Sequence, residues 1–258
     1  MPSTRVQFAN RRGQTLSGII DQSAEPANHY ALFAHCFTCT KDLKAIVRIS
    51  RNLAKLGIAV LRFDFTGLGD SKGDFSESNF ETNCEDILSA VNFLNTEYQG
   101  PSLLIGHSLG GAAMIATAGQ IESAKAICTI ASPSETYHLA DFLLSQNPKI
   151  GTEGQGEVTI GGRTYLMKQQ LLESLRRQPM EQHLANLRLP FLVFHSPTDK
   201  TLNYDHAINM HQKSQGPTSI ITLDGSDHLL VDRPDDVQYV ANLIANWAQR
   251  FLAFPPEQ

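Results

Sequence analysis

The sequence alternates short, wholly apolar runs with longer amphipathic stretches, and this alternation limits the possible folds most strongly. Runs such as YALFAH, IAVLRFD and PSLLIG are apolar on both faces, as strands of a parallel sheet buried on both sides must be. Between these runs, apolar residues recur at helical spacing. The alternation predicts an α/β fold with a mostly parallel sheet covered by helices on both faces.

Eight strands are expected in this sheet. The first two, RVQFAN and TLSGII, are separated by RRGQ and predict an antiparallel hairpin. Six later runs complete the set: YALFAH, IAVLRFD, PSLLIG, KAICTIA, PFLVFH and SIITL. Because 258 residues with 41% hydrophobic content suffice for one large core, the whole chain, 1–258, is expected to form a single domain.

Capping signals mark two of the intervening helices. Ser78 followed by Glu81 predicts a capping box, ahead of an apolar face that includes Cys84. Cys84 is therefore expected in the core. Near the end of the chain, Asp232 and Pro234 predict the start of a long last helix.

One long segment, 134–189, interrupts the alternation. It contains helical patterns at 139–144 and 171–176, separated by EVTIGGRTYLM, a hairpin pattern with a glycine pair at its turn. Ordinary connections of this kind are about 2–6 residues long. The insertion is therefore expected to form a small cap over a site.

Charge and hydropathy argue against several kinds of partner. A net charge of -5 without a block of like charges leaves no basic surface for nucleic acid. The most apolar long window, 101–119, has a histidine and a serine at its middle, so no membrane span is expected. The opening stretch MPSTRVQFANRRGQTLSG lacks the apolar centre of a secretory signal, which favours a cytoplasmic protein. The tail 254–258 is typical of a terminus or the start of a linker.

The strand pattern PSLLIG runs directly into GHSLGG, a match to G-x-S-x-G. In this pattern, the glycines permit a tight turn from strand to helix that exposes one serine in a strained conformation. The unpaired N–H groups of the following helix then face the reaction site. Ser108 is the candidate nucleophile.

A serine nucleophile needs a base and an orienting carboxylate, here expected in the chain order serine, acid, histidine. His228 lies in a loop just before the last helix, whereas His211 lies within a helical pattern. Asp199 follows the strand PFLVFH, at the edge of the sheet where open α/β folds place their sites. We expect His228 as the base and Asp199 as the acid, with Asp224 and Asp227 as alternatives.

Attack on a carbonyl also requires N–H donors for the oxyanion. The backbone N–H of Leu109 is expected to supply one, and that of Phe37, in the loop FAHCFTCTKD, the other. The same loop contains Cys36 and Cys39, which are expected to be thiols in a reducing compartment, with a disulfide or a redox function as the alternative. No metal is expected, because the cysteines supply too few ligands.

At these residues the sequence resembles the α/β-hydrolase superfamily, through HCF, FDFTGLGDS, GHSLGG, PTD and GSDH. The longer stretches HCFTCTKDLKAIVRIS, LRFDFTGLGDS and HSPTD are similar to the hydrolase half of proteins that carry a C-terminal OsmC-like thiol peroxidase domain. The resemblance implies the hydrolase fold, and it leaves two alternatives: a free-standing relative, or one domain of a longer protein that carries an OsmC-like domain. In the oxyanion turn, Cys36 stands where most relatives have glycine. His35 and Asp64 are expected to hold loops beside the site rather than to catalyse.

The sequence thus predicts a serine hydrolase that cleaves carboxylic esters through an acyl-enzyme, with no cofactor and with a small-molecule acyl ester as substrate. Tyr137, Phe142, Leu143 and Leu144 favour short to medium acyl chains if they line the pocket; otherwise they are plain cap core. A thioesterase or a serine peptidase would use the same three residues. The remaining alternative is a non-catalytic binding module that partners an OsmC-like peroxidase.

Overall fold

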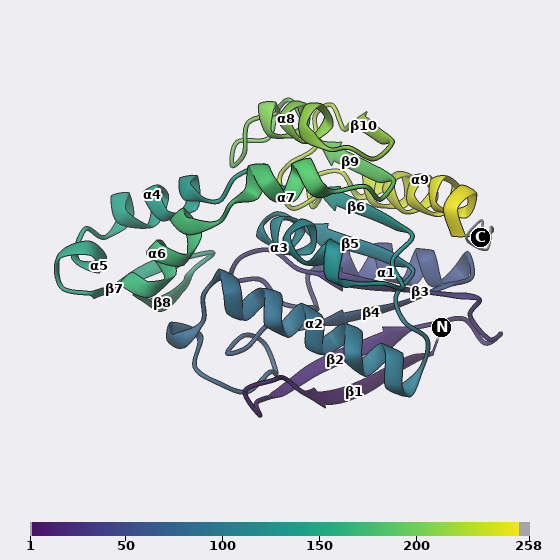
Figure 1. Cartoon of the computed structure of the whole chain (residues 1–258), viewed down its shortest axis with the longest axis horizontal. Helices are drawn as coiled ribbons and strands as arrows, with labels where there is room; N and C mark the ends of the chain where they lie inside the picture. The colour runs from purple at the N-terminus through teal and green to yellow at the C-terminus, as the bar shows by residue number, and fades with distance from the viewer. Residues whose placement is uncertain (1, 253–258) are drawn as a thin grey trace.

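A twisted eight-stranded sheet runs through the centre of the computed structural model, which describes residues 2–252 (Figure 1). Its spatial order is β1-β2-β4-β3-β5-β6-β9-β10. The strands are β1 Ser3–Ala9, β2 Thr15–Asp21, β3 His29–Ala34, β4 Ile58–Phe63, β5 Leu103–His107, β6 Ala126–Ile130, β9 Phe191–His195 and β10 Thr218–Thr222.

The sheet is antiparallel at one edge and parallel elsewhere. Strand β1 pairs antiparallel with β2, and β2 antiparallel with β4, while the other neighbours in the sheet all pair parallel. The predicted α/β fold with a mostly parallel eight-stranded sheet is confirmed. Its parallel strands end along one edge, so the loops that follow them converge there.

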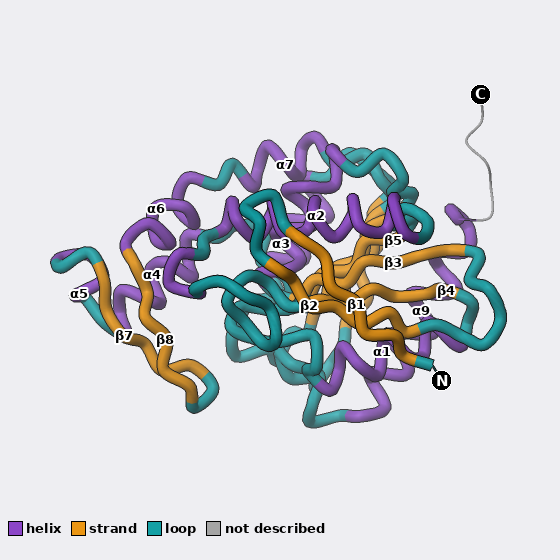
Figure 2. The backbone as a smooth tube through the Cα atoms, turned by 90° about the horizontal axis from the view of Figure 1, so that it is seen from below, coloured by secondary structure: helices purple, strands orange, loops and turns teal. Residues whose placement is uncertain are grey.

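Helices cover both faces of the sheet. Figure 2 shows α2, α3 and α7 on one side and α1 and α9 on the other. Side chains on the two faces of β5 belong to two separate hydrophobic cores. Leu104 packs with α2 and α3, and Leu103 packs with α1 and α9. The helices are α1 Lys44–Lys55, α2 Phe80–Glu97, α3 Leu109–Thr117, α4 Tyr137–Gln146, α5 Lys149–Thr152, α6 Gln169–Arg177, α7 Met180–Asn186, α8 Asp205–Lys213 and α9 Pro234–Leu252, with short 3₁₀ helices η1 Phe75–Glu77 and η2 Ala118–Gln120.

The larger part of the segment between β6 and β9, from α4 to α6, extends away from the sheet, and α7 returns to pack against α3 (Figure 1). It holds α4, α5, the hairpin β7 Gln155–Ile160 and β8 Arg163–Lys168, then α6 and α7. The two predicted helices and the hairpin are present; the short helices α5 and α7 were not predicted. Leu143 is fully buried, whereas Tyr137 and Phe142 are 56% and 46% exposed. Leu143 is therefore part of the packed interior of this segment, whereas about half of Tyr137 and of Phe142 is exposed to solvent.

The start of α2 differs from the prediction. Its N-cap is Asn79, whose side chain accepts from the Thr82 N–H while the Thr82 hydroxyl accepts from the Asn79 N–H. The predicted box of Ser78 and Glu81 was wrong because Glu81 instead accepts a hydrogen bond from Ser174 in α6. The hydrogen bond to Ser174, far along the chain, thus replaces the one expected between Glu81 and Ser78. Further along α2, Cys84 is half-buried against the core.

Between residues 2 and 252, no helix combines the length and apolar character needed to cross a bilayer. The tail 254–258, interpreted above as a terminus or linker, lies outside the described residues.

Candidate active site

Ser108 occupies the turn between β5 and α3 in a conformation that L-residues rarely adopt. Its φ and ψ are 52° and -126°, and its N–H donates to the Ile130 carbonyl at 2.9 Å. The turn depends on close backbone approach, because a Cβ at Gly106 would lie 2.3 Å from the Cα of Gly111. The strain is held by the surrounding sheet and presents the hydroxyl at the edge where the parallel strands end.

The structure brings Ser108, His228 and Asp199 together. The Nε2 atom of His228 lies 3.0 Å from the Ser108 Oγ, and its Nδ1 lies 2.7 Å from Asp199 Oδ2. Both ring nitrogens of His228 are therefore engaged. The alternative acid Asp227 instead accepts from backbone N–H groups of its own loop, including that of Leu229.

Asp199 is fixed as an acceptor. Its side chain is fully buried, and its Oδ1 accepts from the backbone N–H groups of Thr201 and Leu202 at 2.7 and 3.1 Å. Burial alone raises the pKa of Asp199, but the hydrogen bonds from His228 and these amides outweigh it, so the pKa lies below its ordinary value. An ionised Asp199 can hold the His228 imidazole in one tautomer and stabilise its protonated form.

Two residues that support this arrangement were missed in the sequence. Ser132 donates to the carbonyl of Ser108 at 2.8 Å, and His107 is buried directly beside the turn. His107 precedes the serine in GHSLGG, so its position was visible, but its side-chain partner lies far along the chain. Ser132, which follows β6, belongs to no motif that could have identified it in the sequence.

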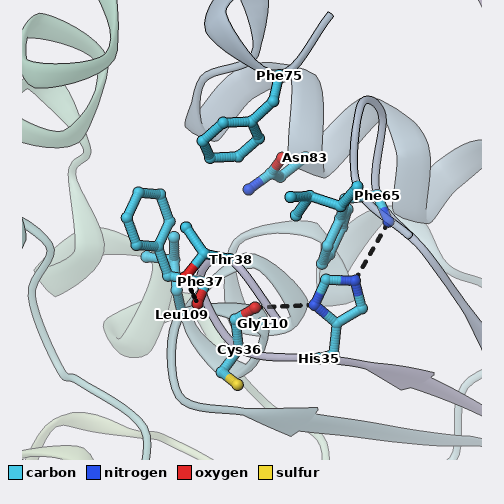
Figure 3. Close-up of a pocket in the computed structure, with 10 residues that line it drawn as sticks. His35, Cys36, Phe37, Thr38, Phe65, Phe75, Asn83, Leu109 and Gly110 are labelled. Atoms are coloured by element: carbon cyan, nitrogen blue, oxygen red, sulfur yellow. Dashed lines mark hydrogen bonds between the residues drawn. The ribbon is translucent and has the colours of Figure 1, made fainter. Parts of the chain in front are cut away.

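Phe37 and Leu109 face one hollow of about 220 Å³ that opens to solvent (Figure 3). Within residues 2–252, neither backbone N–H is used in a hydrogen bond to another group. The turn is held by His35, whose Nδ1 lies 2.8 Å from the Cys36 carbonyl and whose Nε2 accepts from the Phe65 N–H at 3.3 Å. Burial lowers the pKa of His35, so the ring is neutral, with the proton on Nδ1.

The expectation of free thiols at Cys36 and Cys39 was wrong. The two residues form a disulfide across a turn that brings their Cα atoms within 5.3 Å. Thr38, between them, has a φ of 59°, and the Cys39 N–H donates to the Cys36 carbonyl. Sequence spacing allows such a pair but does not fix the turn that joins it. The other cysteine in an expected core position, Cys84, remains a thiol whose pKa burial raises to about 12.

A buried ion pair joins the end of the oxyanion loop to the loop after β4. The Lys41 ammonium lies 2.6 Å from Asp64 and 2.7 Å from Asp70. Burial alone lowers the pKa of Lys41, but these carboxylates raise it, so the side chain stays charged. A Cβ at Gly69 would lie 2.1 Å from an Asp64 oxygen, so this sharp loop requires glycine. Asp64 thus holds the two loops together, as expected, by accepting hydrogen bonds from Lys41 and from the Asp70 N–H.

One set of side chains has the composition of a metal site. Glu135, His138 and His206 each bring a ligand atom within 4.8 Å of the others. The Glu135 carboxylate already bonds His138 Nδ1 at 2.9 Å, and the Ser134 N–H donates to His206 Nδ1. These bonds join α4 and the loop before it to α8.

Comparisons with known proteins agree on the family. A sequence profile described as the alpha/beta hydrolase family matches residues 31–237. The mitochondrial palmitoyl-protein thioesterase ABHD10 of Mus musculus is 26% identical over 202 residues, which cover 73% of this chain; the chain spans 65% of that protein's length. The monoglyceride lipase of Rattus norvegicus is 24% identical over 237 residues, covering 80% of this chain and 78% of the lipase.

Solved structures include a relative of higher identity. The esterase domain of a Rhodothermus marinus protein is 40% identical, with a TM-score of 0.78, covering 98% of this chain and all of that domain. Est1E from Butyrivibrio proteoclasticus, solved with ferulic acid, is 19% identical with a TM-score of 0.84, covering 96% of this chain and 100% of Est1E. The second match shows the shared fold alone. With the family profile spanning most of its length, the chain belongs to the alpha/beta hydrolase family.

Proposed function

We propose that the chain is a serine hydrolase that cleaves carboxylic esters through an acyl-enzyme. The supporting observation is the continuous line of hydrogen bonds from Asp199 through His228 to Ser108. In this mechanism Ser108 Oγ attacks the ester carbonyl while His228 Nε2 takes its proton and passes it to the leaving alcohol. Asp199 stabilises the imidazolium that forms. A water molecule then attacks the acyl-enzyme by the same steps, with His228 again taking and passing on the proton.

The oxyanion is assigned to the backbone N–H groups of Leu109 and Phe37. Leu109 is the first residue of α3, where helix N–H groups lack partners within the helix. Phe37 lies across the same hollow. Each donor of this kind contributes roughly 3–4 kcal/mol to transition-state stabilisation.

We assign acyl groups of short to medium length to this hollow. Its lining residues come from the loops after β3 and β4, from η1 and from α2 and α3, with none from α4. The exposed Tyr137 and Phe142 are therefore not assigned to the acyl pocket. The likeness to an esterase domain supports an oxygen ester as the substrate.

Replacing Ser108 with alanine tests the mechanism. Hydrolysis of a short-chain nitrophenyl ester is expected to fall by about a millionfold, since the nucleophile and its base act as a unit. Ser145→Ala, at an exposed site on α4, is the matched control and is expected to keep wild-type activity. A fluorophosphonate probe should label the wild type and the control but not the variant. Unchanged hydrolysis in Ser108→Ala would refute the proposal.

Thioester cleavage is the second candidate, favoured by the similarity to a palmitoyl-protein thioesterase. The same three residues serve either leaving group, so the comparison must hold the acyl group constant. A higher kcat/KM for a butanoyl thioester than for the matching oxygen ester, lost in Ser108→Ala, would establish this candidate.

Two further proposals concern the setting of the enzyme. The motifs shared with hydrolase–OsmC proteins support association with an OsmC-like peroxidase domain, and a cytoplasmic location is proposed with it. Purification of the tagged chain from an extract of its own cells tests the association with an OsmC-like domain. Fractionation of the same cells tests the location. Recovery without such a domain, or recovery in an exported fraction, would count against the corresponding proposal.

A further inference from the structure

Asn83 is a polar side chain at a hollow that is also lined by aromatic and aliphatic side chains. The hollow is lined by the side chains of Phe37, Phe65, Leu68 and Phe75. Asn83 projects into it from α2, and Figure 3 shows its carboxamide between the rings of Phe75 and Phe65. Among residues 2–252, no group forms a hydrogen bond with that carboxamide, while the backbone N–H of Asn83 donates to the Asn79 carbonyl.

The other polar side chains at the hollow are already satisfied. The Thr38 hydroxyl donates to the Phe37 carbonyl at 2.7 Å. Both ring nitrogens of His35 are engaged, at the Cys36 carbonyl and the Phe65 N–H. Asn83 is therefore the lining side chain that retains donors and an acceptor for a bound molecule.

The position of Asn83 on α2 is one where packing alone would select an apolar residue. Phe80, three residues earlier, and Ile87, four residues later, lie on the same face of the helix and are both fully buried. Asn83 itself is partly exposed at the hollow. Its carboxamide is therefore open to the hollow, where a bound molecule can take the place of solvent as its hydrogen-bond partner.

The hollow lies on the acyl side of the proposed reaction. The leaving oxygen must face His228 Nε2, because it receives the proton from that atom. Neither His228 nor Asp199 lines the hollow, whereas Phe37, Leu109 and Gly110 do. A carbonyl whose oxygen points at the two N–H groups and whose leaving group faces His228 therefore directs its acyl chain toward Phe75 and Asn83.

We infer that Asn83 binds an oxygen substituent, a hydroxyl or oxo group, on the acyl chain of the substrate, and this inference rests on the proposed ester hydrolysis. The carboxamide can donate to either kind of oxygen and can also accept from a hydroxyl. Phe75, Phe65 and Leu68 contact the carbon chain around it. The substrate class is thus narrowed to short oxygenated acyl esters.

The test compares kcat/KM for nitrophenyl esters of butanoate, 3-hydroxybutanoate and 3-oxobutanoate. In the wild type we expect the oxygenated esters to be preferred, and Asn83→Leu to lower the ratio of 3-hydroxybutanoate to butanoate by about tenfold, the effect of losing one hydrogen bond. Asn92→Leu, an exposed change on the same helix, is expected to keep the wild-type ratio. A ratio that is the same in wild type and Asn83→Leu overturns the inference.

Asn83→Asp covers the case in which the leucine variant fails to fold. A carboxylate accepts from a hydroxyl but cannot donate to an oxo group, so the ratio of 3-oxobutanoate to 3-hydroxybutanoate is expected to fall about tenfold. An unchanged ratio contradicts the inference. Ser108→Ala distinguishes a failure of the proposed function from a failure of this inference. A wild type that cleaves none of the esters overturns both. Cleavage that depends on Ser108 but is unaffected by the Asn83 variants overturns this inference alone.

Discussion

The Nε2 atom of His107 lies 2.8 Å from the backbone carbonyl oxygen of His228. The residue before the proposed nucleophile thus fastens the loop that carries the proposed base, across 121 positions of the chain. Burial and the neighbouring His228 lower the pKa of His107 to about 3. The ring is therefore neutral near neutral pH, and its Nε2–H donates to the carbonyl.

Replacing His107 with leucine should make stability less sensitive to acid. In the wild type, unfolded His107 takes up a proton below pH 6.5, whereas folded His107 does so only near pH 3. Between these values the residue lowers the free energy of unfolding by about 1.4 kcal/mol for each pH unit of acidification. His107→Leu lacks this loss, but near pH 7 it is expected to be less stable by about 1–3 kcal/mol, because the His228 carbonyl loses its donor.

Urea unfolding at pH 7, 5.5 and 4 measures this effect. The stability gap between wild type and His107→Leu should narrow as the pH falls and should reverse by pH 4, where the accumulated loss in the wild type reaches about 3.5 kcal/mol. His211→Leu, at an exposed position on α8, is the control and should follow the wild type. A gap that stays constant over this range would contradict the assignment.

Breaking the disulfide with Cys36→Ser and Cys39→Ser should weaken both stability and turnover. Closing so short a loop contributes about 2 kcal/mol in the chain-entropy account. Phe37 lies between the two cysteines, so a looser turn should misplace its N–H and lower kcat by about tenfold, less than the full loss of a donor. Denaturant unfolding and ester kinetics measure the two effects.

A mass measurement tests whether Cys36 and Cys39 are disulfide-bonded in the native protein. Mass analysis without reductant should find the peptide with Cys36 and Cys39 lighter by two hydrogens, and Cys84→Ser should behave as wild type. Equal stability and equal kcat in the double variant would show that the bond has no part in positioning the turn.

Removing the charge of Lys41 should be far more costly than removing a surface charge. Lys41→Met leaves Asp64, which is fully buried, without its cation, and the expected loss of stability is about 3–5 kcal/mol. Lys168 pairs with Glu77, whose side chain is 60% exposed, so Lys168→Met should cost about 0–1 kcal/mol.

Restoring neutrality gives the control for the Lys41 experiment. A double variant with Asp64→Asn should recover part of the lost stability, since it removes the uncompensated charge. Similar losses in Lys41→Met and Lys168→Met, measured by urea unfolding, would show that the buried pair contributes no more than the surface pair.

The sheet and the proximity of Ser108, Asp199 and His228 could be predicted because both follow from local patterns and chain order. Each of these residues lies just after a recognisable apolar strand, and parallel strands that end at one edge bring such loops together. The predicted order of serine, acid and histidine then selected among several aspartates and histidines. No knowledge of side-chain contacts was needed.

What the sequence did not predict depends on tertiary contacts. The cap of α2 moved to Asn79 because Glu81 bonds Ser174, a residue of the inserted segment. The spacing of Cys36 and Cys39 fits a thiol pair as well as a disulfide. Asn83 belongs to no sequence motif. Its place in the hollow depends on how α2 lies relative to the oxyanion loop, which the sequence does not give.

The β7–β8 hairpin reaches the oxyanion loop through Tyr165. Its hydroxyl donates to the Thr38 carbonyl at 3.3 Å, and its ring packs on Phe75, which in turn packs on Phe37. Because Thr38 directly follows Phe37, the hydrogen bond holds the residue that carries a proposed oxyanion donor. The inserted segment thereby contributes to the geometry of the site without lining the hollow.

Tyr165→Phe removes this hydrogen bond and keeps the ring. Stability is expected to change by about 1 kcal/mol or less, since the site is partly solvated. If the bond positions the Phe37 N–H for the transition state, kcat should fall several-fold while KM stays close to the wild-type value. Tyr137→Phe, at a side chain 56% exposed, is the matched control and should leave both constants unchanged. A rise in KM at constant kcat would instead place the role of Tyr165 in substrate binding.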